Sequence, residues 1–336
     1  MNIRKRTPYT YTAKLVASAL ALVAMFVVAM SFGAADVTMK DVWLVLTTGQ
    51  KNDTLTMLRE IRYPREVAAI LVGSALAVAG SIMQGLTRNP LADPGLLGLT
   101  AGANAALALT IIMIPTAGYF GTMIACFVGA ACGSLLVLGI GAIKKGGLSP
   151  LRLVLAGSAV SALLYAVADG SGLLFKVSKD VTMWTAGGLI GTSWSQVQAI
   201  APIVLIGVLI AVALSRQLTI LSLNEEAAVG LGLRTVYVKV ALNILVILLA
   251  GAAVALVGNM AFIGLMVPHI VRYLFGTDYR SIVPMSALWG AVFMLMADTL
   301  ARTINAPYET PVVAIIAMMG LPFFLLIVRK GVKGTS

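Results

Sequence analysis

Few residues of this sequence have the type and spacing that chemistry requires. The only histidine is His269, in Val-Pro-His-Ile-Val-Arg, and one imidazole alone makes neither a metal site nor a catalytic dyad. The nearest approach to a phosphate-binding loop, at 141–147, lacks the lysine and the hydroxyl residue at the required places. We therefore predict no catalytic residue, no metal site and no nucleotide site within this chain.

A stripe of polar and small residues runs along one apolar stretch, at 150–172. Gly157, Ser161, Tyr165 and Asp169 follow one another at four-residue spacing, which places them on one face of a helix. Contact with lipid would be costly for such a face, so it is expected to meet protein or a water-filled cavity. The spacing leaves both interpretations open: the wall of a cavity, or a helix–helix seam with one carboxylate near its end.

Arginines and carboxylates are spaced for ion pairing at two further places. Arg62 and Glu66 stand four residues apart, and so do Asp298 and Arg302, so each pair can form on a helix. With Arg65, these arginines could instead hold acidic groups of another molecule through charge-assisted hydrogen bonds.

The composition indicates which elements must position these residues. Of the 336 residues, 60% are hydrophobic and 11% are charged, and the mean hydropathy is +0.98. A soluble domain has about 45–50% apolar and about 25% charged residues, so a soluble enzyme is excluded, and a disordered chain is excluded as well. Apolar runs long enough to cross a bilayer predict an all-α membrane protein with about ten spans. They lie at 14–34, 66–84, 94–114, 119–143, 150–172, 197–215, 236–257, 261–275, 281–301 and 310–328.

An even number of spans places both termini on one side of the membrane, and the charges indicate which side. In this arrangement 16 of the 24 Lys and Arg residues share the side of the termini, which the positive-inside rule identifies as the cytoplasm. The formal net charge of +11 is thus a signal of topology and requires no nucleic acid. Arg62, Arg65 and Arg302 are exceptions, because they are expected on the outer side.

Two segments of the chain resemble each other at a constant offset. Leu71–Gly80 is similar to Leu249–Gly258, and a proline follows ten residues later in both cases, Pro90 and Pro268. The first segment would run toward the cytoplasm and the second away from it. This repeat predicts two inverted five-helix halves, as in many transporters, although the packing of small residues alone would explain the residue types.

The longest cytoplasmic stretch follows the sixth span, at 215–234. Asn224 can cap a short helix there, with Glu225 and Glu226 in its first turn. The alanines and glycines that follow keep its surface small, which would allow docking into a groove of a partner. A helix lying on the membrane surface is the alternative.

Several motifs together resemble the FecCD-type permeases of ABC importers, which take up iron–siderophore complexes, haem or cobalamin. They are Ile61-Arg-Tyr-Pro-Arg65, Gly80-Ser-Ile-Met-Gln84, Asn89-Pro-Leu-Ala-Asp-Pro-Gly-Leu-Leu-Gly98, Glu225-Glu-Ala-Ala-Val-Gly-Leu-Gly232, Phe262-Ile-Gly-Leu-Met-Val-Pro-His-Ile-Val-Arg272 and Ala297-Asp-Thr-Leu-Ala-Arg302. The resemblance runs from about Asp36 to Arg329. It implies the class II importer permease fold in a single transmembrane domain, 1–336, with cytoplasmic tails at 1–13 and 329–336 and a cytoplasmic coupling loop at 216–235.

The resemblance also implies partners. Family members form a dimer of permeases in the bacterial cytoplasmic membrane, with two cytoplasmic ATPases and an outer binding protein. The chain would then be no enzyme and would bind no cofactor, because ATP and Mg are used by the ATPase. The second permease would be either a copy of this chain or a paralogue.

Residue roles follow from the same resemblance. The positions matching the arginines that grip acidic residues of the binding protein are Arg62, Arg65 and Arg302. Those matching the coupling helix are Glu225, Glu226, Ala227, Ala228, Gly230 and Gly232. The span at 150–172 would line the pathway, with Gly157, Ser161, Tyr165 and Asp169.

The expected function is uptake of ferric siderophores driven by ATP, with haem or cobalamin as alternative cargo. An ion-coupled secondary transporter shares inverted repeats, but the spans lack the chain of buried carboxylates that such carriers use. A scaffold or receptor without transport is the remaining alternative.

Overall fold

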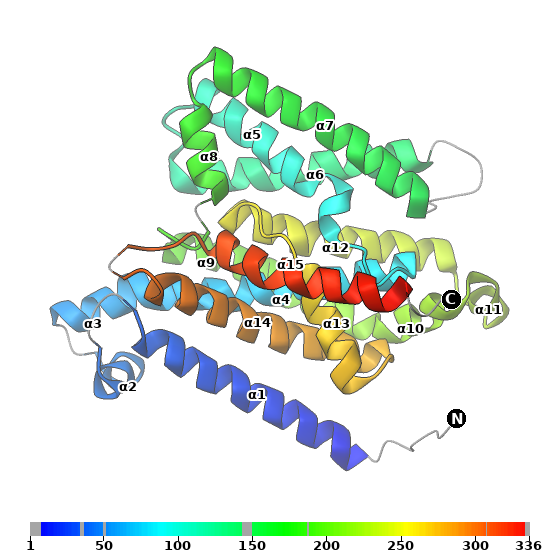
Figure 1. The fold of residues 1–336 in the computed structure, drawn as a ribbon, viewed down its shortest axis with the longest axis horizontal. Helices are drawn as coiled ribbons and strands as arrows, with labels where there is room; N and C mark the ends of the chain where they lie inside the picture. Colours follow the sequence, from blue (N-terminus) through cyan, green and yellow to red (C-terminus); the bar gives the residue numbers. More distant parts are fainter. Residues whose placement is uncertain are drawn as a thin grey trace.

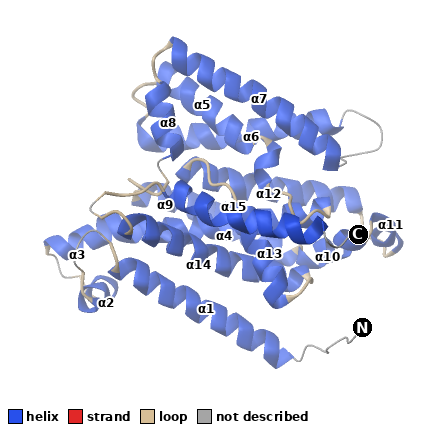
Figure 2. Ribbon diagram, viewed as in Figure 1, coloured by secondary structure: helices blue, strands red, loops and turns tan. Residues whose placement is uncertain are grey.

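The computed structural model describes residues 8–33, 37–49, 52–142, 150–186, 188–306 and 308–332. Within this part of the chain all regular structure is helical (Figure 2). Residues 1–7 of the predicted N-terminal tail and residues 333–336 of the predicted C-terminal tail lie outside the described residues.

The described helices fit the predicted spans. Seven are long and apolar enough to cross a membrane: α1 (Pro8–Ser31), α4 (Tyr63–Thr87), α6 (Gly118–Ala142), α7 (Pro150–Leu174), α9 (Trp194–Ala213), α12 (Thr235–Val257) and α14 (Tyr279–Thr303). Three further apolar helices are α5 (Leu99–Met113), α13 (Ile263–Phe275) and α15 (Val312–Val332). Each of the ten coincides with a predicted span, so the prediction of an all-α polytopic fold is confirmed.

Short helices gather at the two ends of this bundle (Figure 1). At one end lie α2 (Met39–Thr47), α3 (Asp53–Met57) and α8 (Ser178–Ala186). At the other lie α10 (Ser215–Leu223) and α11 (Glu225–Gly230), where α1 also begins and α15 ends. We call the first the outer end and the second the inner end.

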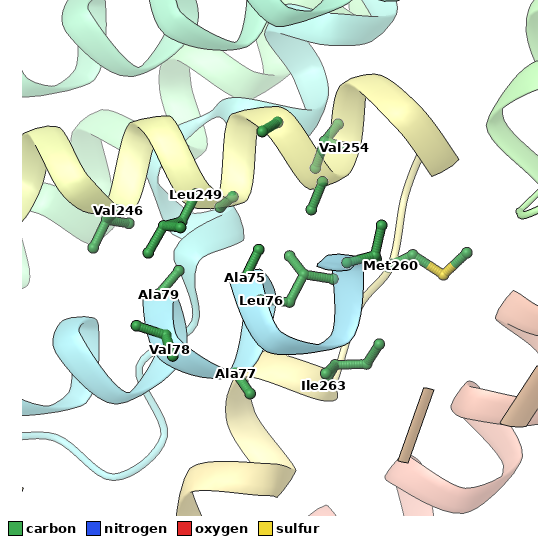
Figure 3. Packing of buried hydrophobic residues seen from close by; sticks show 14 of the residues in the cluster. Ala75, Leu76, Ala77, Val78, Ala79, Val246, Leu249, Val254, Met260 and Ile263 are labelled. Carbon is green, nitrogen blue, oxygen red and sulfur yellow. The ribbon is translucent and has the colours of Figure 1, made fainter. Parts of the chain in front are cut away.

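Helix α4 lies at the centre of the molecule because glycines let its neighbours approach closely. It packs against α14, α12, α13 and α9. A Cβ atom on Gly73 would stand 2.2 Å from the carbonyl oxygen of Gly290 in α14, and one on Gly80 would stand 1.9 Å from that of Gly264 in α13. Figure 3 shows alanines of α4 lying against Val246 and Leu249 of α12 in the buried core.

The outer end of α4 continues into α3 through a π-helical turn, η1 (Leu58–Arg62). The three elements form one continuous helix of 35 residues. This turn supports a small separate cluster of buried apolar residues between α1, α2 and α3. Its members are Met30, Val42, Val45, Leu55 and Leu58.

The two halves make corresponding contacts. In the first half α5, α6 and α7 pack together, while α4 packs against α14 of the second half; in turn α12 packs against α6 of the first half. Of the matched glycines, Gly73 faces α14 and Gly251 faces α6, so they occupy corresponding places, but Gly80 and Gly258 do not. Gly80 lies within α4, whereas Gly258 ends α12 with a φ of 75°. Pro90 follows α4 in a loop, whereas Pro268 lies inside α13. The equal spacing from glycine to proline in the two segments therefore does not mark equivalent positions.

Two helices begin inside the bundle after a segment that folds back. A 3-10 turn, η2 (Pro94–Leu97), precedes α5 and contacts α4, α6, α7 and α12. The segment after Gly258 similarly leads into α13 at Phe262, which has a φ of 69°. Glycine at 98 takes a φ of 72° without steric cost, whereas the same conformation is strained for a phenylalanine.

Candidate functional site

Arg65 is held by two carboxylates at the outer end of α4. Its Nε and Nη2 atoms donate to the carboxylate of Asp298 at 2.9–3.2 Å, and its Nη1 donates to both oxygens of Glu309 at 3.0 Å. The Arg65 side chain is 11% exposed, whereas that of Glu309 is 32% exposed. Glu309 is therefore the member of this group that solvent or another molecule can reach.

Arg302 completes the group from α14. Its Nη2 lies 2.5 Å from Oε1 of Glu66, and its Nε lies 3.1 Å from Oδ2 of Asp298. The predicted pair of Asp298 and Arg302 is confirmed. Glu66, in contrast, pairs with Arg302 from another helix rather than with Arg62, because α4 and α14 pack so closely at Gly73.

Arg62 occupies a different environment beside this group. It is buried, and its Nη1 donates to the carbonyl oxygen of Met30 in α1 at 2.8 Å. Gly33 lies over its guanidinium group, where a Cβ atom would stand 2.6 Å from Nη2. The structure thus brings the three predicted docking arginines together at the outer end and buries most of their surface.

The predicted helix after the sixth span is present at the inner end as α11. The side-chain oxygen of Asn224 accepts from the backbone N–H of Glu226 at 3.0 Å, which confirms the predicted cap. The helix ends in a Schellman motif, in which Gly232 donates to Val229 and Leu233 donates to Ala228. Gly232 takes a φ of 78° there, which explains the glycine.

The surface of α11 is small and accessible. Ala228 is buried, whereas Glu225, Glu226, Ala227, Gly230 and Gly232 are exposed. The Glu225 carboxylate lies 2.5 Å from Nζ of Lys239 in α12. Helix α10 precedes α11 and packs against α4 and α14, so α11 is joined to the core of the bundle.

A cavity of about 180 Å³ lies where α5 and α13 begin. The first turns of both helices line it, together with parts of α4, α7 and α12. Polar side chains of Asp93, Thr100, Ser161, Tyr165 and Asn259 are among its walls.

Two residues of the predicted stripe on α7 therefore face a cavity, and the other two lie elsewhere. Gly157 is packed against η2, where a Cβ atom would stand 1.9 Å from the carbonyl oxygen of Leu96. Asp169 is exposed. Whether the stripe lines a transport pathway stays a prediction.

No group of three or more His, Cys, Asp or Glu residues suited to a metal ion occurs in the described part of the chain. The ring of His269 packs edge-on against Phe323 of α15, which agrees with the packing role that one isolated histidine favours.

Three residues near these sites were not singled out from the sequence. Glu309 lies in the loop between α14 and α15, and hydropathy does not show that this loop meets α4. Lys239 lies about one turn inside the span that follows α11. Asp93 falls between two predicted spans, in a loop expected to face the cytoplasm, but it lines the cavity because the loop folds back into the bundle. Only the Asp-Pro-Gly turn around it gave a local signal, since Asp93 accepts from the N–H of Gly95 at 2.7 Å.

Comparison with known sequences gives one clear family. The sequence model of the FecCD transport family matches residues 20–330. The iron(3+)-hydroxamate import system permease protein FhuB of Bacillus subtilis is 42% identical over 90% of this chain and 79% of its own length. The hemin transport system permease protein HmuU of Yersinia pestis is 38% identical over 89% of this chain and 90% of its own. FhuG, a second permease protein of the iron(3+)-hydroxamate system, is 33% identical over 93% of this chain and 95% of its own length.

A solved structure shares the fold of this chain. A metal-chelate type ABC transporter in an inward-facing conformation superposes with a TM-score of 0.83 at 26% identity, covering 95% of this chain and 99% of the other.

Proposed function

The chain belongs to the FecCD transport family, and we propose that it is the membrane-spanning permease of an ATP-driven importer of ferric siderophores. The observation that carries this proposal is the family match over residues 20–330. Two relatives named for iron(3+)-hydroxamate and Fe(3+)-citrate import support a ferric chelate as cargo. Haem is the alternative favoured by the hemin permease of Yersinia pestis, and cobalamin is the other cargo that the motifs imply.

The mechanism we propose is alternating access without chemistry in this chain. A cytoplasmic ATPase pair would bind ATP and Mg²⁺, and its closure would displace α11 and, through it, the helices around the cavity at the start of α5 and α13. This requires the inner end of the bundle to face the cytoplasm of a bacterial cell membrane, with both termini there. The excess of Lys and Arg on that side supports this orientation.

Coupling to the ATPase is proposed for α11, through Glu225, Glu226, Ala227, Ala228, Gly230 and Gly232. Five of these six residues are exposed, so a groove of a partner could accommodate the small surface of the helix. Changing Glu225→Lys and Glu226→Lys together should abolish co-purification of the ATPase and uptake. Lys239→Met is the matched control, because it frees Glu225 without altering the surface of α11. Uptake and ATPase binding that survive the double change would contradict the assignment.

Docking of an outer binding protein is proposed for Arg62, Arg65 and Arg302. Of the three, Arg65 has a partly exposed partner, Glu309, and a carboxylate of the binding protein could replace Glu309 on its Nη1. Arg65→Gln should weaken capture of the binding protein while retaining a donor for Asp298. Changing all three arginines to Glu should abolish it. ATPase co-purification is the folding control, and unchanged capture by a folded triple variant would contradict the docking role.

The pathway is proposed to run along α7, between this chain and a second permease. The helix presents exposed apolar residues such as Leu155 and Leu163 beside Ser161 and Tyr165, so another helix or lipid must cover it. The pairing of FhuB with FhuG in one named system supports a paralogue as partner, and a second copy is the alternative. Cys126→Ala and Cys132→Ala are combined with either Ser161→Cys or Tyr165→Cys. The introduced thiol should react with a water-soluble thiol reagent, and it should be protected from that reagent when the transport cycle is arrested. Inert cysteines at both positions would remove these residues from the pathway.

The deciding experiment is reconstitution of the permease with its ATPase and binding protein in proteoliposomes. Uptake of a ferric hydroxamate, haem and cobalamin is compared with and without ATP. We expect uptake of the ferric chelate that requires ATP. Uptake driven by an ion gradient without the ATPase would favour a secondary transporter, and co-purification without any substrate-stimulated ATPase activity would favour a scaffold.

A further inference from the structure

Helix α13 contains a proline that leaves one of its own carbonyl groups without a partner. In an α-helix the carbonyl of residue i accepts from the N–H of residue i+4. Pro268 has no N–H, so the carbonyl of Gly264 lacks its intrahelical donor. An unsatisfied carbonyl is costly when buried in the bundle, and Gly264 is buried.

The side chain of Gln84 in α4 supplies the missing donor. Its Nε2 lies 3.3 Å from the carbonyl oxygen of Gly264 and 3.1 Å from that of Leu265. Gln84 stands one helical turn from Gly80, where α4 and α13 come into backbone contact. That close crossing brings the Gln84 amide within reach of α13, and the side chain is only 2% exposed.

The other end of the Gln84 amide is also used. Its Oε1 accepts from Nη2 of Arg272 in α13 at 2.9 Å, and Nη2 also lies 3.4 Å from the hydroxyl oxygen of Tyr279. The backbone N–H of Tyr279 donates to Oγ1 of Thr219 in α10 at 3.0 Å. The Thr219 hydroxyl in turn donates to Asp278, the cap of α14, at 2.9 Å.

These contacts join the segment that leads to α11 with the beginning of α13. Thr219 belongs to α10, which runs directly into α11, and Gly264 lines the cavity at the start of α5 and α13 together with Ser161 and Tyr165. A second contact holds α10 on α4, because Nε of Arg88 donates to the carbonyl oxygen of Leu221 at 3.2 Å.

We propose that Gln84 is a positioning residue that links displacement of α10 and α11 to the first turn of α13 and so to the cavity. The role of α11 in this inference rests on the proposed function. The contacts of Gln84 themselves do not, because the proline, the freed carbonyl and the amide are features of this chain. Gln84, Pro268 and Arg272 fall in two separate sequence motifs. The chain of contacts from Gly264 through Gln84, Arg272 and Tyr279 to Thr219, which we call the relay, gives all three residues one role.

The first experiment separates this role from a merely structural one. Gln84→Leu removes the donor, Pro268→Ala restores an N–H that can reach the Gly264 carbonyl, and the double variant combines them. Ser74→Ala is the control, since it removes another hydrogen bond between α4 and α14 outside the relay. Thermal stability, ATPase rate and substrate transported per ATP are measured with the whole complex in lipid nanodiscs or proteoliposomes.

We expect Gln84→Leu to lower the melting temperature and to reduce transport per ATP roughly tenfold, the scale of coupling residues remote from ligands. The double variant should regain the melting temperature but not the transport per ATP. A double variant that recovers both would show that Gln84 only satisfies the carbonyl. Unchanged transport per ATP in Gln84→Leu would overturn the inference in the same way.

The second experiment requires no transport. Hydrogen exchange of the backbone amides at 261–266 is measured in the permease with an unchanged α11 and in the permease carrying both Glu225→Lys and Glu226→Lys. Exchange should change when Gln84 is present and stay constant in the variant with Gln84→Leu and Pro268→Ala. No change with Gln84 present would overturn the relay. A working relay in a complex that transports none of the three cargoes would instead contradict the proposed function alone.

Discussion

The two ends of α4 are fastened to the second half of the chain by polar groups of different character. At the outer end, three arginines and three carboxylates lie together: Arg62, Arg65, Arg302, Glu66, Asp298 and Glu309. At the inner end a neutral amide, Gln84, and the guanidinium groups of Arg272 and Arg88 make hydrogen bonds to neutral acceptors, beside an open groove of about 540 Å³.

The difference indicates which end can rearrange. Removing one partner from a buried charge pair costs about 3–5 kcal/mol, because a charge remains without compensation. A hydrogen bond between neutral groups contributes about 0.5–1.5 kcal/mol net, and one to a charged group such as Arg272 contributes about 1.5–3 kcal/mol. The outer end is therefore expected to stay together through a transport cycle, while the inner end can exchange contacts at a lower cost. Four predictions test this contrast, from the largest expected effect to the smallest.

Arg302→Met should produce the largest loss of stability. It leaves the buried Glu66 carboxylate without its partner, while Asp298 keeps Arg65, so the free energy of unfolding should fall by about 3–5 kcal/mol. Unfolding in detergent, followed by helical circular dichroism, measures this. Lys239→Met breaks the exposed pair with Glu225 and should cost about 0–1 kcal/mol. Equal losses in the two variants would remove the contrast between buried and exposed pairs.

Alanine at either close crossing of α4 should be the next most damaging change. Gly73→Ala and Gly80→Ala each place a methyl group against a backbone carbonyl, at a cost of about 1–3 kcal/mol. Only Gly80→Ala moves α13 away from Gln84, so only this variant should also lower transport per ATP. Gly139→Ala in α6 meets nothing within 4 Å and should be neutral in both measurements. The same transport defect in Gly73→Ala would show that the inner end has no special role.

Glu309→Gln should have a smaller effect, and in the favourable direction. The substitution weakens the partly exposed pair with Arg65, which frees Nη1 for a carboxylate of the binding protein. Exposed pairs are worth about 0–1 kcal/mol, so the affinity for the binding protein should rise by up to about fivefold. Surface plasmon resonance with immobilised permease measures this affinity. Glu60→Gln removes the same charge from an exposed position of η1 and controls for net charge. Weaker binding by Glu309→Gln would mean that Glu309 itself contacts the partner.

The smallest effect concerns α2 at the outer end. The hydroxyl and the backbone N–H of Thr38 hydrogen-bond the Asp41 carboxylate and lower its pKa below the ordinary value. A carboxylate with a lowered pKa stabilises the fold above its unfolded-state pKa, and that contribution is lost as the pH falls through the folded-state pKa. Thr38→Val should therefore reduce stability more at pH 7 than once Asp41 is protonated, where only the loss of the hydrogen bond from the Asp41 N–H to the Thr38 hydroxyl remains. A loss of stability that is the same at both pH values would assign the whole effect to that cap.

The sequence was informative where the physical signal is local. Length and polarity of apolar runs predicted the positions of all ten apolar helices, and the cap at Asn224 and the pair of Asp298 with Arg302 depend on neighbours within one helical turn. These features need no knowledge of which helices touch.

The contacts that the sequence did not predict all join distant parts of the chain. Glu66 pairs with Arg302 rather than Arg62 because the glycine crossing at Gly73 and Gly290 sets the spacing of α4 and α14. Asp93 lines a cavity because η2 folds back into the bundle, and hydropathy cannot distinguish such a segment from a cytoplasmic loop. The Gln84 contact depends on where a proline in one helix meets an amide in another.

The π-helical turn η1 carries a consequence for the length of the chain. A π-helical turn closes i→i+5 hydrogen bonds, so it holds one residue more than an α-helical turn while the helix on either side keeps nearly the same facing. Deleting one residue from Leu58–Arg62 would therefore convert the turn to ordinary α-helix and leave Leu55 facing Met30 and Val42 in the small outer cluster. An α-helix advances about 100° per residue, so deleting a second residue would rotate everything before it by about that angle and turn Leu55 away. Homologous proteins that share this outer cluster should therefore tolerate the loss of one residue here but not of two.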